Sequence, residues 1–164
     1  MVVSALDTFS MRAYCSVMTS LASARITSAA SPQAFFDRWA DMATWPQWNL
    51  DTDWVRLDGP FTEGATGTLK PKGGFAVRFV VERLVPGESF LDVSYLPGAR
   101  LVFDHGVRVL DDGRTEVSVQ VRLSGLLAPL WRLILGSGVA SSVQPDLERL
   151  AAAAEASENI RDRS

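Results

Sequence analysis

Apolar and polar side chains alternate along two consecutive stretches in the second half of the chain, Arg100–Leu110 and Thr115–Leu123. A period of two is typical of β-strands with one buried and one solvated face. In the second stretch the valines oppose charged and polar residues. In the first stretch, the residues predicted to face the interior are Leu101, Phe103, His105, Val107 and Val109.

Turn residues divide the preceding part of the chain into further short strands. The complete set of predicted strands is Leu21–Ser28, Trp54–Leu57, Gly67–Lys70, Phe75–Val85, Phe90–Leu96, Arg100–Leu110 and Thr115–Leu123. The connections are short and rich in glycine and proline, for example Pro86-Gly87 and Pro97-Gly98. Short connections join antiparallel neighbours, because parallel strands need crossovers of a dozen residues. The sequence therefore predicts a seven-stranded antiparallel sheet.

Alternation also assigns faces to the two central strands that carry charged residues. The residues predicted to face the interior there are Phe75, Val77, Phe79, Leu91, Val93 and Tyr95. This assignment places Arg78 and Asp92 on the outer face, where a charged group remains in water. The opposite register would place both charged residues in the interior.

Two segments of the chain have helical signals. Ser31-Pro32 is typical of a helix start, and it precedes a predicted helix over Gln33–Asp41. A second short helix or turn is expected across Thr44–Trp48, since Pro46 can begin a helix but not lie within one. The long apolar-patterned stretch Leu126–Ala156 predicts a C-terminal helix, which glycines 136 and 138 and Pro145 should kink.

These elements predict an α+β fold in which a curved sheet wraps around the C-terminal helix, with two short helices after the first strand. Such a layout leaves space for a mostly apolar pocket between sheet and helix. We expect a loosely ordered extension over residues 1–18, a ligand-binding domain over 19–157 and a polar tail over 158–164.

Composition excludes several classes of function. The 164 residues correspond to one domain, and 16 basic against 19 acidic side chains give a net charge of −3, which does not favour nucleic acid. One cysteine and one histidine exclude an internal disulfide and a site of several Cys and His ligands, so we expect no metal and no cofactor.

The sequence also bears on location. No apolar run reaches the roughly 20 residues of a membrane span. The stretch 11–24 has some features of a secretory signal, but Ser16, Thr19 and Ser20 interrupt its apolar part. Translation starting at Met11 or Met18 is the plainer alternative. We therefore expect a soluble cytoplasmic protein, as a monomer or weak homodimer.

Several short motifs at these positions resemble one superfamily. They are Ser31-Pro32 with Phe35, Trp39 and Asp41; Trp45-Pro46-x-Trp48; Gly59-Pro60-Phe61 with Gly64 and Gly67; Pro86-Gly87; Leu96-Pro97-Gly98; Leu101-x-Phe103-x-His105; Gly113-x-Thr115-x-Val117; and Pro145-x-Leu147-x-x-Leu150. Over residues 21–156 the chain resembles the SRPBCC or START-like superfamily, whose fold is called helix-grip. Within it, the chain is most similar to the bacterial polyketide cyclase/dehydrase-like branch. The resemblance implies a cavity for a small hydrophobic ligand.

His105 is the candidate catalytic residue, because a neutral imidazole on the concave face could act as general acid or base. The alternative is a buried histidine satisfied by a neighbour. The residues expected to line the ligand site are Trp45, Trp48, Phe75, Val77, Phe79, Val93, Tyr95, Leu101, Phe103, His105, Val119, Trp131 and Leu135. Aromatic residues in this set would give large apolar contacts to a ligand, although core packing explains Trp45, Trp48 and Trp131 equally well.

Three functions are compatible with the sequence. The first is binding of a polyketide- or lipid-like ligand. The second is a metal-independent cyclase, aromatase or dehydratase that uses the shape of the cavity together with His105. The third is a protein-interaction module, which an exposed apolar patch beside the long helix would favour.

Overall fold

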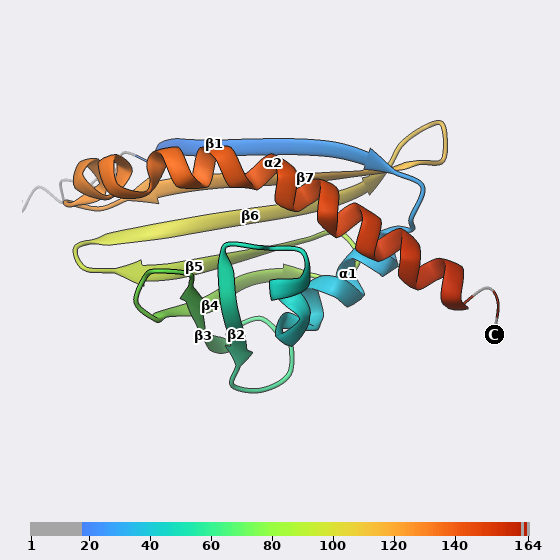
Figure 1. Cartoon of the computed structure of the whole chain (residues 1–164), viewed down its shortest axis with the longest axis horizontal. Helices are drawn as coiled ribbons and strands as arrows, with labels where there is room; N and C mark the ends of the chain where they lie inside the picture. Colours follow the sequence, from blue (N-terminus) through green and yellow to red (C-terminus); the bar gives the residue numbers. More distant parts are fainter. Residues whose placement is uncertain (1–17, 162, 164) are drawn as a thin grey trace, which may run out of the picture.

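The computed structural model describes residues 18–161 and 163. Its elements are β1 (Thr19–Ser28), α1 (Pro32–Ala40), the 3₁₀ helix η1 (Met42–Gln47), β2 (Thr52–Leu57), β3 (Thr66–Pro71), β4 (Val77–Val85), β5 (Ser89–Leu96), β6 (Ala99–Val109), β7 (Thr115–Ser124) and α2 (Ala128–Arg161). The curved sheet and the helix α2 across it confirm the predicted α+β fold (Figure 1). The extension predicted over residues 1–18 lies, except for Met18, outside the described residues.

All neighbouring strands are antiparallel, in the order β1-β7-β6-β5-β4-β3-β2. β1 and β2 follow one another in the chain but occupy opposite edges of the sheet. The segment that connects them holds α1 and η1, which lie against the concave face (Figure 1). The chain thus places aromatic residues of α1 inside the curve of the sheet.

α1 begins where the sequence predicts. The side chain of Ser31 accepts a hydrogen bond from the backbone N–H of Ala34, and Pro32 occupies the first turn. This N-cap satisfies a donor that the first helical turn would leave unpaired. The helix then buries Phe35, Phe36 and Trp39. Burial of these three rings fixes α1 against the inner face of the sheet.

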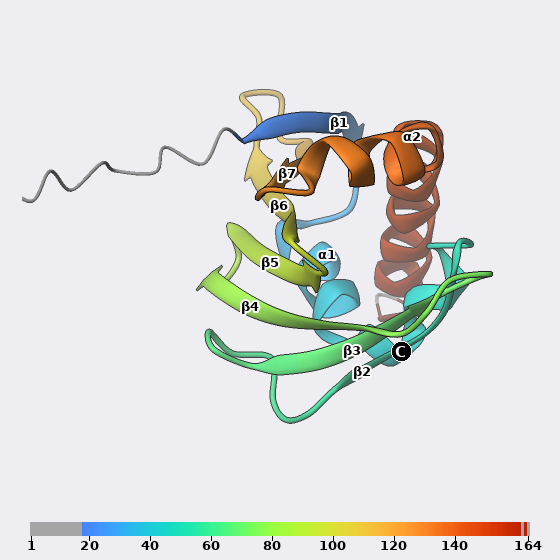
Figure 2. The ribbon, with the colours of Figure 1, turned by 90° about the vertical axis from the view of Figure 1, so that its left-hand side faces the viewer.

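α2 is one continuous helix, but its first turns run at a marked angle to the rest (Figure 2). A bend agrees with the predicted kink at glycines 136 and 138 and Pro145. α2 continues to Arg161, so it includes the first residues of the polar tail predicted over 158–164. The Glu158 carboxylate accepts hydrogen bonds from the backbone N–H of Ser31 at 3.0 and 3.1 Å. This tertiary contact holds the last turns in the helix.

Irregularities in strand pairing contribute to the curvature of the sheet. Register shifts lie between Ser20 and Ala22 in β1, Thr52 and Trp54 in β2, and Val81 and Arg83 in β4. Extra residues of this kind bend a strand and increase its twist. Such irregularities leave no mark in the alternation of apolar and polar residues, so their positions were not predicted from the sequence.

The faces predicted for β4 were right, whereas those predicted for β5 were reversed. Phe79 and Val81 are buried, while Arg78 lies outside and pairs with Asp58 at 3.0 Å. In β5, Phe90, Asp92 and Ser94 pair with inner-face residues of β6 and therefore face inward. Val93 and Tyr95 lie on the convex face.

Candidate functional site

A carboxylate and an imidazole meet on the concave face of the sheet. The Oδ1 atom of Asp92 in β5 lies 3.2 Å from Nε2 of His105 in β6, and both side chains are buried, with 9% and 8% of their surface exposed. Within the described part of the chain, Nδ1 of His105 has no hydrogen-bond partner. The structure thus pairs one ring nitrogen with a carboxylate and leaves the other unused.

Aromatic rings surround this pair. The ring of Phe90 stacks on His105 at 4.1 Å with an interplanar angle of 6°. Trp39 of α1 and Phe103 of β6 lie at 5.5 and 6.2 Å between ring centroids. Rings on three sides leave few polar groups near the imidazole, and this makes Asp92 its principal hydrogen-bonding partner.

The position of Asp92 follows from the turn between β5 and β6. Pro97 and Gly98 form a two-residue turn, and Gly98 has a φ of 66°, a conformation that glycine adopts without strain. Leu96 therefore pairs with Ala99. Four residues further from the turn on each strand, Asp92 pairs with Phe103. Paired residues share a face, so Asp92 lies on the same face as Phe103 and His105. Alternation had assigned Asp92 and Phe90 to the outer face, with the opposite register as the alternative, and Phe61 was not among the predicted site residues. This turn was the signal that could have placed the first two.

Most of the predicted site residues lie on the inner side of the fold. Pairing or packing against the core places there Val77, Phe79, Leu101, Phe103, His105, Val119, Trp131 and Leu135. Trp45 and Trp48 are buried and pack against one another at 5.4 Å. The indole N–H of Trp45 donates to the carbonyl of Trp39 at 3.1 Å, so this ring has a structural contact of its own.

Three predicted site residues lie elsewhere. Val93 pairs with Val102 on the convex face. Tyr95, also convex, is 49% exposed and donates to the Glu82 carboxylate at 3.5 Å. Their prediction failed because counting apolar residues favoured the wrong face of β5. Phe75 lies not in a strand but in the β3–β4 turn, where its ring contacts Trp131 at 6.2 Å.

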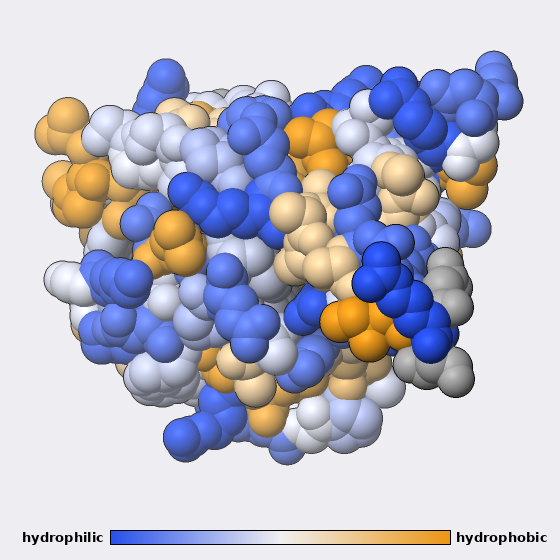
Figure 3. All heavy atoms as spheres, turned by 45° about the vertical axis from the view of Figure 1, so that its right-hand side comes forward, coloured by the Kyte–Doolittle hydropathy of each residue, from blue (hydrophilic) through white to orange (hydrophobic). Residues whose placement is uncertain are grey.

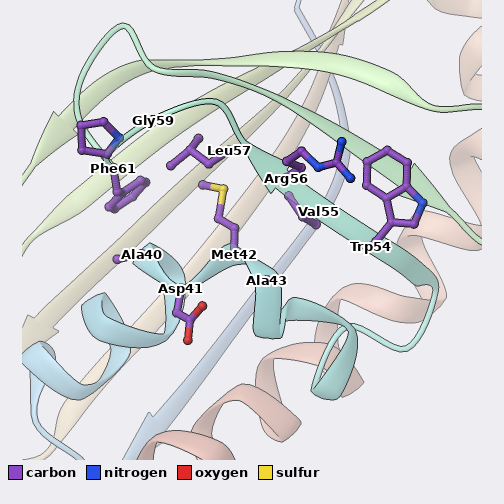
Figure 4. A pocket seen from close by; sticks show the side chains of 11 residues that line it. Ala40, Asp41, Met42, Ala43, Trp54, Val55, Arg56, Leu57, Gly59 and Phe61 are labelled. Carbon is purple, nitrogen blue, oxygen red and sulfur yellow. The ribbon is translucent and has the colours of Figure 1, made fainter.

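A groove of about 560 Å³ lies between the α1–η1 junction and β2 with its following loop (Figure 4). Met42 and Val55, both buried, form its floor, and Arg56 lies over the ring of Trp54 at 5.5 Å. The lining residue Phe61 touches Phe90 edge-on at 5.3 Å, and Phe90 stacks on His105. Phe61 therefore separates this groove from the Asp92–His105 pair.

A second hollow of about 760 Å³ lies near the C-terminal end of β6, with Gly106 and Ser118 in its lining. These residues pair with one another on the face opposite His105. Arg25 and Arg108 flank it, and both contact the carboxylate of Glu116, at 3.6 and 2.7 Å. Hydrogen bonding from Arg108 lowers the pKa of Glu116, against a smaller rise caused by burial. Neither hollow is the predicted space between sheet and α2.

Among the described residues, no three His, Cys, Asp or Glu side chains gather as a metal site. In the same part of the chain, no helix is long and apolar enough to span a membrane. The candidate site thus consists of the Asp92–His105 pair, the rings around it and the inner apolar surface.

A seven-stranded antiparallel sheet curved around a long C-terminal helix, with short helices after β1, defines the helix-grip class. A family model described as polyketide cyclase / dehydrase and lipid transport matches residues 20–155. The chain belongs to this family. Among curated proteins, none matches it significantly.

Solved structures share the fold. The di-domain ARO/CYC StfQ from the steffimycin biosynthetic pathway superposes with a TM-score of 0.69 at 12% identity, over 87% of this chain and 52% of that one. Truncated norcoclaurine synthase from Thalictrum flavum gives 0.63 at 10% identity, over 85% and 92%. A START superfamily protein from Mycobacterium smegmatis gives 0.58 at 17% identity, over 84% and 95%. Identities this low establish the fold and leave the function to the site.

Proposed function

We propose that the protein binds a small hydrophobic ligand, polyketide- or lipid-like, between the concave face of the sheet and α2. The observation that carries this proposal is the Asp92–His105 pair, a polar group placed among aromatic rings on the concave face. Ligand sites combine a mostly apolar lining with a few placed polar groups. In this proposal the rings hold the body of the ligand and the pair fixes its polar end.

Incomplete burial of the inner apolar surface supports the proposal. Several side chains on the inner side remain partly exposed even though they pack against the core: Leu69, Val77, Phe103, Val119, Trp131, Leu135 and Val139. A protein interior is otherwise close-packed, with few voids larger than a water molecule. Apolar surface left uncovered on this side is surface that a ligand can cover.

Filling this space tests the proposal. We expect Val119→Trp to abolish binding of acyl and polycyclic ligands, measured by native mass spectrometry of the protein with a ligand panel and of material purified from cells. Gln120→Trp is the matched control, because its side chain is exposed on the opposite face of β7. Equal ligand binding by both variants, with unchanged thermal unfolding, would contradict the proposed location.

A second candidate function is a cyclase or dehydratase, and the geometry of His105 favours it specifically. When Nε2–H donates to Asp92, the lone pair of Nδ1 is free to accept a proton. The imidazole can then remove a proton from a carbon next to a carbonyl and return it to a departing hydroxyl, which leaves as water. Asp92 would hold the tautomer and stabilise the imidazolium.

Turnover separates the two functions. With a polyketone substrate, we expect His105→Ala to bind the ligand with reduced affinity, since the rings still hold its body, and to lose at least about a hundredfold in rate, the usual contribution of a general acid–base. Asp92→Asn should lower the rate less and change its pH profile, because Asp92 acts through His105. Full turnover by His105→Ala would leave ligand binding as the only function of the site.

A further inference from the structure

The start of α2 carries an exposed apolar surface that packing within the chain does not explain. Leu126 is 90% exposed and Leu133 is 83% exposed. With them, the residues defined here as the leucine patch are Leu126, Leu127, Leu130, Leu133 and Ile134. Orange atoms gather at the upper left edge of Figure 3, the end of the molecule where α2 begins in Figure 1. Exposed apolar clusters of this kind mark interaction sites.

The leucine patch lies beside the proposed ligand space. Trp131, in the same turns of α2, donates its indole N–H to the carbonyl of Pro97 at 2.9 Å. Its ring system meets the ring of Phe75 in the β3–β4 turn, with the ring centroids 6.2 Å apart. Phe75 and Trp131 therefore join the tip of that hairpin to α2 at the edge of the patch.

The chemistry of the patch favours lipid over a protein partner. Protein interfaces carry about one hydrogen bond per 100–200 Å² and are enriched in aromatic residues, methionine and arginine. Between Leu126 and Leu135, the only side chains with hydrogen-bonding groups are Trp131, whose N–H is already used, and Arg132. Aliphatic side chains make only non-directional contacts, and these suit acyl chains. Helices that lie in a membrane surface bury such side chains among the lipid chains.

The charge around the patch selects the kind of lipid. From Gly125 to Gln144 the sequence has one charged residue, Arg132, and no carboxylate. Arg132 is exposed, and Lys72 is exposed in the hairpin that carries Phe75. Neither side chain makes a salt bridge with any described residue. Basic groups beside an apolar surface attract anionic headgroups.

We propose that the leucine patch docks the protein on anionic membrane surfaces, so that the ligand passes between bilayer and protein beside Phe75 and Trp131. This inference rests on the proposed function, since it names the surface from which the hydrophobic ligand would come or to which it would go. Docking is peripheral, with only the first turns of α2 and the hairpin tip in contact with lipid.

Flotation with vesicles tests the inference on the full chain. We expect the protein to float with vesicles of phosphatidylcholine and phosphatidylglycerol, and to float weakly with phosphatidylcholine alone. Leu133→Asp should reduce partitioning at least about tenfold, since a leucine buried in an apolar phase contributes that much or more. Val109→Asp is the matched control, because Val109 is also apolar and 62% exposed but lies at the far end of β6.

Each other outcome overturns the inference. Absence of flotation, or equal flotation of Leu133→Asp and wild type, would show that the patch does not bind lipid. A concentration-dependent dimer that Leu133→Asp dissociates would show that a second copy covers the patch. Ligand binding in vesicle-free solution, compared between wild type and Val119→Trp, is measured separately. Flotation of a wild-type protein that binds no acyl or polycyclic ligand, or that binds it as well as Val119→Trp does, would contradict the proposed function alone. Ligand binding by wild type but not by Val119→Trp, without flotation, would contradict the docking surface alone.

Discussion

At the scale of single residues, the central feature is the burial of Asp92 and His105 as a pair. Each side chain supplies the hydrogen-bond partner that the other would lack on an aromatic surface. Loss of one partner from a buried pair leaves the other unsatisfied, and this costs more than the pair itself contributes. The pair is therefore a structural unit as well as a candidate site.

A double-mutant cycle measures this unit. We expect His105→Phe to lower the free energy of unfolding by about 1–3 kcal/mol, because it leaves the Asp92 carboxylate buried without a partner. The double variant Asp92→Leu/His105→Phe should recover a large part of the loss. Urea denaturation of the four proteins gives the coupling. If the changes in the free energy of unfolding of the two single variants add up to that of the double variant, the two side chains do not stabilise one another.

A second prediction concerns Asp146 in α2. Burial raises its pKa, an effect that Arg149 reduces and Asp51 increases. A raised pKa in the folded state means that the proton stabilises the fold. This stabilisation is complete below the ordinary aspartate pKa of about 3.9 and is lost as the pH rises through the folded value.

Asp146→Asn removes this titration. We expect the variant to have a higher Tm than wild type at neutral pH, and the difference should shrink as the pH falls towards about 4. Thermal unfolding across this range is the measurement, with Asp112→Asn as the control. Hydrogen bonds from the backbone and side chain of Arg114 lower the pKa of Asp112, so the sign of its effect is opposite. A constant difference at all pH values would contradict the assignment.

At the scale of elements, the sequence predicted nearly every helix and strand, since periodicity and turn residues act locally. The order Ser31-Pro32 located α1, and alternation located β6 and β7. The faces of β5 were mispredicted, because apolar residues occur on both sides of this strand. Val93 and Val102 are buried on the convex face, so burial there does not mark the inside. Pairing across the turn, rather than hydropathy, decided the placement of Asp92.

Close packing between β2, β3 and β4 leads to a prediction at this scale. A Cβ atom on Gly67 would lie 2.3 Å from the ring of Phe79 and 2.7 Å from the carbonyl oxygen of Arg56. We expect Gly67→Ala to destabilise the protein by about 1–3 kcal/mol, the range for overpacking. Gly59→Ala, where nothing lies within 4 Å, should change stability by less than about 0.5 kcal/mol. Chemical denaturation compares the two, and equal stabilities would contradict the packing argument.

At the scale of the whole molecule, the ends of the long helix have different roles. The last turns of α2 are fixed to α1 by polar contacts, among them Arg161 with Asp37 at 2.7 Å and Arg38 with the carbonyl of Ala153 at 3.1 Å. The first turns carry the leucine patch, and they contact the β5–β6 turn through hydrogen bonds from Leu127 and Trp131. The hydropathy of the helix does not predict that its first turns are exposed. An apolar sequence would be expected there whether these turns were buried in the core or exposed.

Ligand exchange should depend on the contact between Phe75 and Trp131. If the ligand passes between the β3–β4 hairpin and α2, Phe75→Ala removes an aromatic contact that each passage must break. An edge-to-face pair of this kind contributes about 0.5–1.5 kcal/mol, so we expect association and dissociation to accelerate by about two- to tenfold. Stopped-flow mixing with a fluorescent fatty acid gives both rates. Val109→Ala is the control. If Phe75→Ala leaves both rates unchanged, the ligand does not enter and leave between the β3–β4 hairpin and α2.

The pairing of β1 with β7 has a consequence for how the chain reaches its structure. Ile26 meets Val117 across this pair, whereas β4 to β7 form a meander in which each strand pairs with the next in sequence. Contacts so distant along the chain slow folding, because a large loop must close before they form. During synthesis, at roughly 5–20 residues per second, β1 leaves the ribosome several seconds before its partner exists. When β7 leaves the ribosome, both of its neighbours in the sheet, β6 and β1, have therefore already been synthesised.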